Sequence, residues 1–316
     1  MKQLYCFSAL VIISLQSAIA GYLNELQAEK VSSHVYVIHG PLELPNENNE
    51  GFMNNPAFIV TDNGVVVIDP GSSVHTGNML LREIRKVTDM PVITVFDTHI
   101  HGDHWLGNAA IRKSYPDVKI YAHSRAIERL QNGEASQWLD TVTGMTDNAI
   151  AGTELVLPNE GLSGGEQLQI DGLAFKTHHT GHAHTDSDIM VELPQQRVLF
   201  AGDIIEHRRA VSVDVPEDFS VTGQIEAIRY ALELPIDIYL PGHGETGGRE
   251  IPEASLRFLE TLYSSVQGYY EEGMADFEMR ERVAADLAEF EDWSGFDELG
   301  KLISHVYLQV EAAEFE

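Results

Sequence analysis

The 316-residue sequence has almost no cysteine, because its single one, Cys6, lies in an N-terminal segment that we expect to be removed. A chain without a further cysteine forms no disulfide and offers no thiolate to a metal or a substrate. Any metal site in it must therefore be built from histidine and carboxylate side chains. The same lack is compatible with export to a bacterial periplasm, although it does not require it.

Positive charge is also scarce, since 20 lysine and arginine residues face 49 aspartate and glutamate residues, a formal net charge of −29. A surface of this kind repels phosphate backbones, so we expect no nucleic-acid partner. Residues 250–316 alone hold 17 acidic residues against four basic ones. We interpret this local excess as a solvated helical face rather than as an acidic interaction tail.

Long apolar runs are missing outside the N-terminus. There, Lys2 precedes the apolar stretch Leu4–Leu15, and the small residues Ser17-Ala18-Ile19-Ala20 follow it. This order is typical of a secretory signal peptide cleaved after Ala20. The apolar stretch is too short to span a bilayer comfortably, which argues against a membrane anchor. We therefore predict a periplasmic or secreted chain with no stable membrane anchor, and the sequence leaves its oligomeric state open.

Short apolar runs typical of strands alternate with longer helical stretches through most of the chain. Asn63-Gly64, between two β-branched runs, is a strong hairpin signal. Strands interspersed with helices favour an α/β sandwich over an all-β barrel. The expected strands are Val35–Ile38, Ala57–Val60, Val65–Ile68, Val92–Phe96, Lys119–Ala122, Leu155–Leu157, Leu168–Ile170, Leu173–Thr177, Ile189–Leu193, Val198–Ala201 and Ile238–Leu240. The expected helices are Thr76–Val87, Trp105–Ser114, Ser124–Gln131 with Ser124 as its N-cap, and Thr222–Leu232.

The chain after Pro252 has a uniformly helical character. Apolar residues recur there at helical spacing, and Pro252 suits the first turn of a helix. These residues are Leu256, Leu259, Leu262, Tyr263, Val266 and Tyr270. No linker rich in Pro, Gly or Ser separates domains. We predict a signal peptide over residues 1–20, one domain over residues 21–250 and a helical C-terminal extension packed on it over residues 251–316.

The most informative segment is Asp97-Thr98-His99-Ile100-His101-Gly102-Asp103-His104, directly after an expected strand. His99 and His101 are two residues apart, so both can point to one side of an extended strand end. Asp103 and His104 follow at the turn into the next helix. Three imidazoles and a carboxylate within six residues indicate a metal site rather than a solvated histidine-rich loop.

Three later segments each place a further metal-ligand type at or near an expected strand. His184 lies in Gly181-His182-Ala183-His184-Thr185-Asp186, shortly before a strand. Asp203 follows the strand Val198–Ala201, and His243 follows the strand Ile238–Leu240 in Pro241-Gly242-His243. Because α/β proteins build their sites at the carboxyl ends of strands, these residues are candidates for the same site.

Together these segments resemble the metallo-β-lactamase superfamily in order and spacing, over nearly the whole chain after the signal. The resemblance implies a four-layer αββα sandwich with a dinuclear metal site at one edge. Carried onto this sequence, it implies that His99, His101 and His184 bind the first metal. Asp103, His104 and His243 would bind the second metal, and Asp203 would bridge the two.

Two choices at the edge of this ligand set follow from the motif. His184-Thr185 matches the family pattern of a ligand histidine followed by threonine, so we favour His184 over His182. His182 is then expected to line the pocket or to form a hydrogen bond with a ligand. Asp69, at the end of the strand Val65–Ile68, is expected to orient the ligands without binding a metal itself.

The implied chemistry is hydrolysis by a metal-bridging hydroxide, since two divalent ions about 3.5–4 Å apart can hold one at neutral pH. We assign catalytic roles to Asp103, which could pass on a proton, and to the bridging Asp203. The mixed histidine and carboxylate set fits two Zn²⁺ ions best, although Mn²⁺ or iron would also fit. The expected substrate is a small ester, lactone, thioester or amide.

The residue at position 203 also bears on the branch of the superfamily. Members that hydrolyse β-lactams usually have Cys or Ser there, whereas an aspartate is typical of glyoxalase-, lactonase- and phosphodiesterase-like members. The segments Ala183–Asp188 and Leu199–Asp203, with the acidic helical tail, are most similar to the exported quinoprotein-relay-type metallohydrolases. The Pro and Gly usual around the ligand histidine are His182 and Ser187 here, which affects the expected pocket rim.

Three alternatives to a general dinuclear hydrolase stay open at this point. The first is a β-lactamase. The second is a glyoxalase II-type thioesterase, which would need basic residues in the C-terminal helices to hold glutathione carboxylates and finds only four after residue 249. The third is a non-catalytic periplasmic metal-binding or redox-partner protein.

Overall fold

The structure is a computed structural model that describes residues 21–210 and 218–315. The segment predicted to be a signal peptide, residues 1–20, lies outside the described residues. Within the described ranges no helix is long and apolar enough to cross a membrane.

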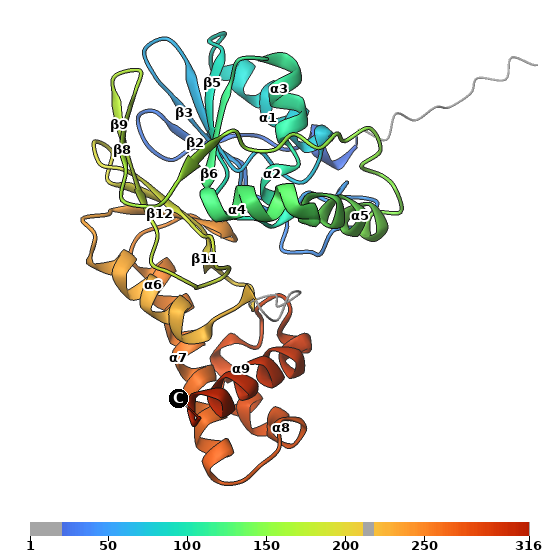
Figure 1. Cartoon of the computed structure of the whole chain (residues 1–316), viewed down its shortest axis with the longest axis vertical. Coiled ribbons are helices and arrows are strands. Elements are labelled where there is room, and N and C mark those ends of the chain that lie inside the picture. The colour runs from blue at the N-terminus through green and yellow to red at the C-terminus, as the bar shows by residue number, and fades with distance from the viewer. Residues whose placement is uncertain (1–20, 211–217, 316) are drawn as a thin grey trace, which may run out of the picture.

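Two mixed sheets form the centre of the molecule (Figure 1). The first sheet has seven strands in chain order, antiparallel from β1 to β4 and parallel from β4 to β7. The second has the order β12-β11-β10-β9-β8, with only β11 and β12 parallel. The strands of the first sheet are β1 (Glu29–Lys30), β2 (Val35–Val37), β3 (Ala57–Val60), β4 (Val65–Ile68), β5 (Val92–Phe96), β6 (Lys119–His123) and β7 (Glu160–Leu162). Those of the second are β8 (Gln167–Ile170), β9 (Leu173–His178), β10 (Met190–Leu193), β11 (Val198–Glu206) and β12 (Ile238–His243).

The two sheets pack face to face, and helices cover their outer faces. Strand β4 shows why: Val66 and Ile68 point into the core between the sheets, while Val65 and Val67 pack against the helices outside. A strand that is buried on both faces typically has a continuous run of β-branched residues, and β4 has such a run. Helices α1 (Val74–Val87) and α3 (Asn108–Ser114) cover the first sheet, and α6 (Val221–Glu233) and α7 (Glu250–Glu271) cover the second. The predicted αββα sandwich is confirmed.

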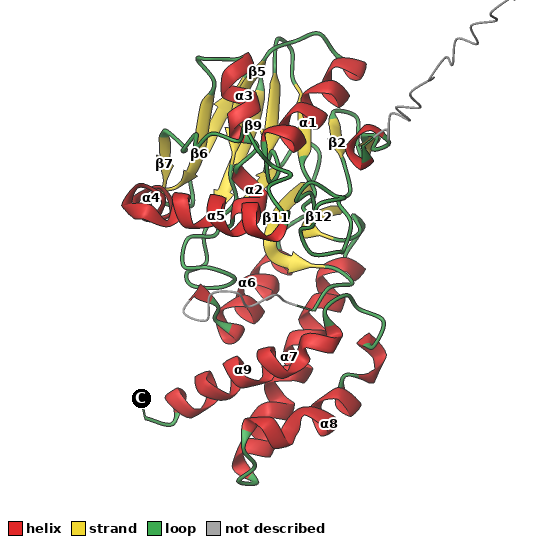
Figure 2. Cartoon of the chain, turned by 90° about the vertical axis from the view of Figure 1, so that its right-hand side faces the viewer, coloured by secondary structure: helices red, strands yellow, loops and turns green. Residues whose placement is uncertain are grey.

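The helical C-terminal extension is also confirmed. It contains the rest of α7, α8 (Asp276–Asp286) and α9 (Leu299–Ala313), which lie beneath the sandwich in Figures 1 and 2. Its apolar residues, among them Leu262 and Val306, belong to the same buried cluster as Ile225 of α6. The extension therefore shares its core with the outer face of the second sheet.

Four local expectations were wrong. Leu155–Leu157 is not a strand, because the edge of β6 is occupied by the next residues: Asn159 N–H donates to the Ile120 carbonyl, and β7 begins at Glu160. The expected helix Trp105–Ser114 is split into α2 (Gly102–Trp105) and α3. The break falls at Gly107, where any Cβ would lie 2.3 Å from the Pro70 carbonyl oxygen.

The other two errors concern helices α4 (Ser124–Arg129) and α5 (Ala135–Met145). The N-cap of α4 is His123, whose ring accepts a hydrogen bond from the Arg125 N–H, and not Ser124. Helix α5 was not expected at all. A π-helical turn, Leu130–Glu134, joins the two helices, with Gly133 at a φ of 119°.

Candidate metal centre

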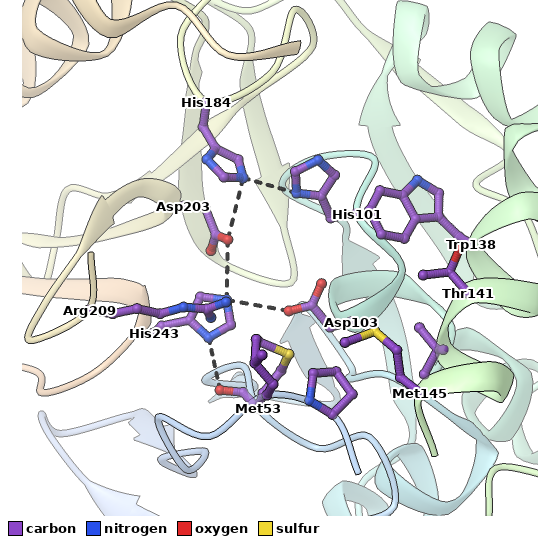
Figure 3. Close-up of a pocket in the computed structure, with 13 residues that line it drawn as sticks. Met53, His101, Asp103, Trp138, Thr141, Met145, His184, Asp203, Arg209 and His243 are labelled. Atoms are coloured by element: carbon purple, nitrogen blue, oxygen red, sulfur yellow. Dashed lines mark hydrogen bonds and ion pairs between the residues drawn. The ribbon is translucent and has the colours of Figure 1, made fainter. Parts of the chain in front are cut away.

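The structure brings together all seven side chains that the resemblance implies as metal ligands. His99 and His101 lie in the loop after β5, and Asp103 and His104 lie in the short helix α2. His184 lies in the loop between β9 and β10, Asp203 lies in β11, and His243 ends β12. Six of the seven are buried, and Asp203 stands between the two sets of histidines (Figure 3).

One set of ligand atoms, the first group, consists of His99, His101, His184 and Asp203. His184 Nε2 lies 2.9 Å from His101 Nδ1 and 3.5 Å from Asp203 Oδ2. His99 Nε2 lies 3.7 Å from the same aspartate oxygen. The four side chains therefore direct their ligand atoms at one point.

The second group consists of Asp103, His104 and His243, again with Asp203. The Nε2 atoms of His104 and His243 each lie 3.2 Å from an Asp203 oxygen. They lie 3.4 Å and 3.3 Å from Asp103 Oδ2. Asp203 thus faces both groups.

The spacing of these atoms fits a metal ion. A tetrahedral ion with bonds of 2.0–2.1 Å holds neighbouring ligand atoms about 3.3 Å apart, close to the 2.9–3.7 Å found here. Among the described residues, His99 Nε2, His104 Nε2 and Asp203 Oδ1 are buried without a hydrogen-bond partner. Buried polar atoms are rarely left unpaired, so these atoms fit ligands of a cation.

Hydrogen bonds behind the second group fix the tautomers of its histidines. His243 Nδ1 lies 2.9 Å from the Met53 carbonyl, which can only accept, so Nδ1 carries a proton and Nε2 is the nitrogen that faces the site. His104 Nδ1 lies 2.8 Å from Asp69 Oδ2. Asp69 also accepts from the Thr98 N–H and hydroxyl, which places Thr98 beside His99. Asp69 occupies the orienting position expected of it.

Two glycines let the strands approach closely enough to form the site. A Cβ at Gly242 would lie 1.8 Å from Asp203 Oδ1, and one at Gly202 would lie 2.6 Å from the Thr98 hydroxyl. Gly202 also has a φ of 53°. The Gly-Asp and Gly-His pairs of the sequence are therefore required by space as well as by ligand chemistry.

The two groups differ in charge. Burial lowers the pKa of His184 to about 3, more than the charge of Asp203 raises it, so this ring is neutral. Burial likewise lowers the pKa of His99. For His243 burial also acts downward, but Asp203 and the hydrogen bonds to both aspartates outweigh it and raise the pKa to about 8. The pKa of His104 is raised for the same reason.

The structure places the competing histidines away from this centre. His182 Nε2 forms a hydrogen bond of 2.6 Å with the Asp218 carbonyl. His178 binds Glu192 and the Tyr230 hydroxyl, and His179 binds the Asp188 carbonyl. His184, and not His182, is the residue that faces His101.

A small pocket with a cavity volume of about 50 Å³ opens onto the metal-ligand candidates. One wall is apolar and comes from α5 and two loops. It consists of Leu44, Pro45, Met53, Trp138, Thr141, Val142 and Met145. The Trp138 ring packs on His101 with a centroid distance of 4.7 Å. This wall was not predicted from the sequence, although Trp138, Val142 and Met145 show the helical spacing that could have revealed it.

A buried pair of Arg209 and Glu206 at the pocket was also not predicted from the sequence. Arg209 lines the pocket and is only 7% exposed; its Nε lies 3.6 Å from Glu206 Oε1. Among the described residues, Arg209 Nη1 and both Glu206 oxygens have no hydrogen-bond partner. Figure 3 draws Arg209 among the residues that line the pocket, and its charge acts to lower the pKa of His243. Arg209 thus brings a cation to the side of the second group.

The C-terminal extension holds this part of the rim. The Ser294 N–H donates to the Arg208 carbonyl, and the Ala210 N–H donates to the Ser294 carbonyl. The Ser294 hydroxyl donates to the Leu42 carbonyl, close to the pocket residue Leu44. One residue of the extension therefore fixes the backbone on both sides of Arg209 and the opposite rim.

Comparisons with known proteins agree with this geometry. The family model described as "Metallo-beta-lactamase superfamily" matches residues 49–243, which include all seven side chains. A metallo-beta-lactamase type 2 of Bacteroides fragilis is 22% identical, over 67% of this chain and 77% of its own. A probable metallo-hydrolase of Methanocaldococcus jannaschii is 25% identical, over 64% of this chain and 93% of its own. The solved metallo-beta-lactamase from Pontibacter korlensis is 20% identical and covers 74% of this chain and 99% of its own with a TM-score of 0.60, a likeness in fold.

Proposed function

This chain belongs to the metallo-β-lactamase superfamily, and from that premise we propose that it is a dinuclear metal-dependent hydrolase. Its proposed substrate is a small ester, lactone, thioester or amide. The observation that carries the proposal is the pair of ligand groups that share Asp203, with ligand atoms 2.9–3.7 Å apart. Two divalent ions held there would supply a hydrolytic nucleophile at neutral pH and polarise the attacked carbonyl.

The side chains of the centre have separate roles in this proposal. Asp203 binds on both sides and fixes the separation of the two groups. Asp103 belongs to the second group and also lines the pocket. The oxygen of its carboxylate that does not bind a metal could therefore take up a proton and pass it to a leaving group. The Trp138 ring, tilted by 51° against His101, covers it and keeps water from that side of the first group.

Arg209 narrows the proposed substrate class. It is the one arginine or lysine among the residues described as lining the pocket, and its Nη1 is buried with no hydrogen-bond partner among the described residues. A guanidinium at this position favours an acceptor with negative charge. The proposed substrate therefore joins an apolar group, on the Trp138 side, to an anionic group on the His243 side.

Zinc is the proposed metal in both groups, because imidazole nitrogens with a few carboxylate oxygens suit it best. Mn²⁺ or iron would be the alternatives, favoured by the carboxylates of the second group. The proposed location is the periplasm or the outside of the cell, after removal of a signal peptide; this rests on the sequence pattern of residues 1–20 alone.

A β-lactamase is the second candidate, because several relatives carry that name, among them IND-1 of Chryseobacterium indologenes, which is 24% identical over 73% of this chain and 86% of its own. Asp203, where such enzymes usually have Cys or Ser, weighs against it. A glyoxalase II-type thioesterase is disfavoured by the acidic C-terminal helices. A non-catalytic metal-binding or redox-partner protein would leave the lined pocket without a use.

A substrate panel with metal-loaded protein tests the proposal. Chromogenic esters, lactones, thioesters and a cephalosporin would be offered to the protein and to its Asp203→Asn variant. We expect turnover of at least one acyl class by the unchanged protein and none by the variant. A protein that binds two ions and hydrolyses no member of the panel would favour the non-catalytic alternative. Turnover of the cephalosporin alone would favour the β-lactamase.

A further inference from the structure

Arg129, the last residue of α4, binds three carboxylates at once. Its Nη1 donates to Asp186 Oδ1 at 2.8 Å and to Asp218 Oδ1 at 2.7 Å. Its Nη2 donates to Asp218 Oδ2 at 2.8 Å and to Glu134 Oε2 at 2.7 Å. Its Nε donates to Glu134 Oε1 at 2.8 Å. All five donors of the guanidinium point to acceptors in a geometry that only arginine offers, and its side chain is 18% exposed. We call these four residues the Arg129 cluster.

The three carboxylates come from three separate segments of the chain. Glu134 ends the π-helical turn before α5, and the wider π turn brings it back to Arg129, five residues earlier. Asp186 lies in the loop that carries His184. Asp218 lies just before α6. One guanidinium therefore ties α4, the start of α5, the His184 loop and the approach to α6.

One side of the Arg129 cluster holds the loop that carries His184. Asp186 is two residues from His184 and also pairs with Arg125 at 2.6 Å. On the other side of the loop, Asp188 accepts hydrogen bonds from the Thr185 N–H and hydroxyl. The Ala183 carbonyl accepts from the Ser220 N–H, and His182 binds the Asp218 carbonyl. Both of these contacts depend on the segment that Arg129 holds through Asp218.

The other side of the cluster reaches His101. Glu134 fixes the π turn from which α5 starts, and α5 carries Trp138, whose ring packs on His101. His101 thus lies between Trp138 and His184, whose Nε2 is 2.9 Å from its Nδ1. Two of the three histidines of the first group are therefore held by segments that Arg129 joins.

The histidines of the second group are not held by the Arg129 cluster. His104 is held by Asp69 and His243 by the Met53 carbonyl, and neither partner belongs to the Arg129 cluster. Asp103 and His104 lie in α2, next to β5 of the first sheet.

We propose that Arg129 is a positioning residue for the first metal only. It sets the distance between His101 and His184 and therefore the affinity of the first group for a metal ion. The metal affinity of the second group does not depend on it. The proposal rests on the metal centre of the proposed function but not on the hydrolysis. Replacement of hydrogen-bonding partners behind metal ligands typically weakens binding about 10–100-fold.

The test is a titration of metal-free protein with Co²⁺ against a competing chelator, which resolves two binding steps without any substrate. The first variant is Arg129→Met. The second is Asp186→Asn, which removes only the charge of Asp186 and serves as the test if Arg129→Met does not fold. His184→Ala and Asp103→Ala serve as references for loss of the first and the second group. Arg229→Met, which breaks the exposed pair of Arg229 with Glu260, is the matched control.

We expect Arg129→Met to weaken one Co²⁺-binding step about 10–100-fold and the other less than about twofold. The Co²⁺ absorption spectrum of this variant should resemble that of His184→Ala. Asp186→Asn should shift the same step by less. Equal weakening of both steps, a spectrum like that of Asp103→Ala, or no change in either variant would overturn the proposal. An unchanged protein that binds no second ion would instead contradict the dinuclear centre.

Discussion

The two ligand groups share Asp203 and are built in different ways. The first group takes His184 from a loop and His101 from beside it, and distant carboxylates joined by Arg129 hold both segments. The second group takes its ligands from α2 and from the end of β12, and direct hydrogen bonds to Asp69 and the Met53 carbonyl hold them. The first group is thus positioned by loop packing, and the second by direct hydrogen bonds to its histidines.

The groups differ in chemistry as well. The histidines of the first group are neutral without metal, whereas those of the second group carry raised pKa values beside Asp103 and Asp203. The first group faces Trp138 and the apolar wall, and the second faces Arg209. A single edge of the sandwich therefore offers two metal positions with different proton competition and different neighbours for a substrate.

The largest effect is expected where the two groups meet. Asp203→Asn removes the carboxylate charge that both share, so we expect both to lose metal. Hydrolysis should fall at least about 100-fold, beyond the loss that follows removal of a ligand's hydrogen-bond partner. Elemental analysis and turnover would measure the two losses, and circular dichroism would check that the fold is intact. Undiminished turnover in this variant would remove Asp203 from the site.

Asp69→Asn should weaken metal binding by the second group more than by the first, the reverse of the effect expected for Arg129→Met. The amide cannot hold the His104 N–H as the carboxylate does, so the affinity of the second group should fall about tenfold. The affinity of the first group should stay within about twofold, although Asp69 also bonds Thr98 beside His99. Chelator competition measures both. Equal weakening of the two steps would show that Asp69 supports the whole centre.

Arg209→Met tests the side of the pocket next to the second group. For matched esters with and without a carboxylate, we expect the KM of the anionic one to rise about tenfold and that of the neutral one to change little. Glu206→Gln is a useful companion, because it leaves Arg209 in place and replaces only the neighbouring carboxyl group. A KM that rises equally for both esters would assign Arg209 to structure rather than to substrate charge.

The smallest effect concerns protons. His243 has a pKa of about 8 without metal, so a metal must displace a proton below that pH. From the proton of His243 alone, the metal affinity of the second group should rise about fivefold from pH 7 to pH 8 and less than about twofold from pH 8 to pH 9. The first step should stay nearly flat, because the low pKa of His184 leaves that ring neutral throughout. Calorimetry in buffers of different ionisation enthalpy would measure the protons released, and equal release in both steps would contradict the difference.

Most of the sandwich and the ligand set could be predicted because local sequence determines them. The β-branched runs of β4 and β5 need no partner to be recognised, and the motif from His99 to His104 lies within one segment. The strand at Leu155–Leu157 was wrong because the register of β6 with Glu160, a long-range pairing, decides where the edge strand begins. Gly107 splits a helix for a similar reason, since Pro70 approaches it from far away in the sequence.

The surroundings of the site were harder to predict than its ligands. Arg129, Asp186 and Asp218 are ordinary charged residues in the sequence, and only the fold joins them. Arg209 and Glu206 follow Asp203 closely, but a charge near a metal ligand does not reveal whether it faces the pocket. Ser294, which holds the rim from the extension, lies 85 residues from Arg209. Positions set by tertiary contacts leave no local pattern to read.

The central claim is that seven side chains hold two cations that share Asp203. Anomalous diffraction from crystals of the zinc-loaded protein, recorded above and below the zinc absorption edge, tests it most directly. Two peaks are expected, one among His99, His101 and His184 and one among Asp103, His104 and His243, with Asp203 in contact with both ions. A single peak at full zinc occupancy, or a peak that Asp203 does not touch, would contradict the claim.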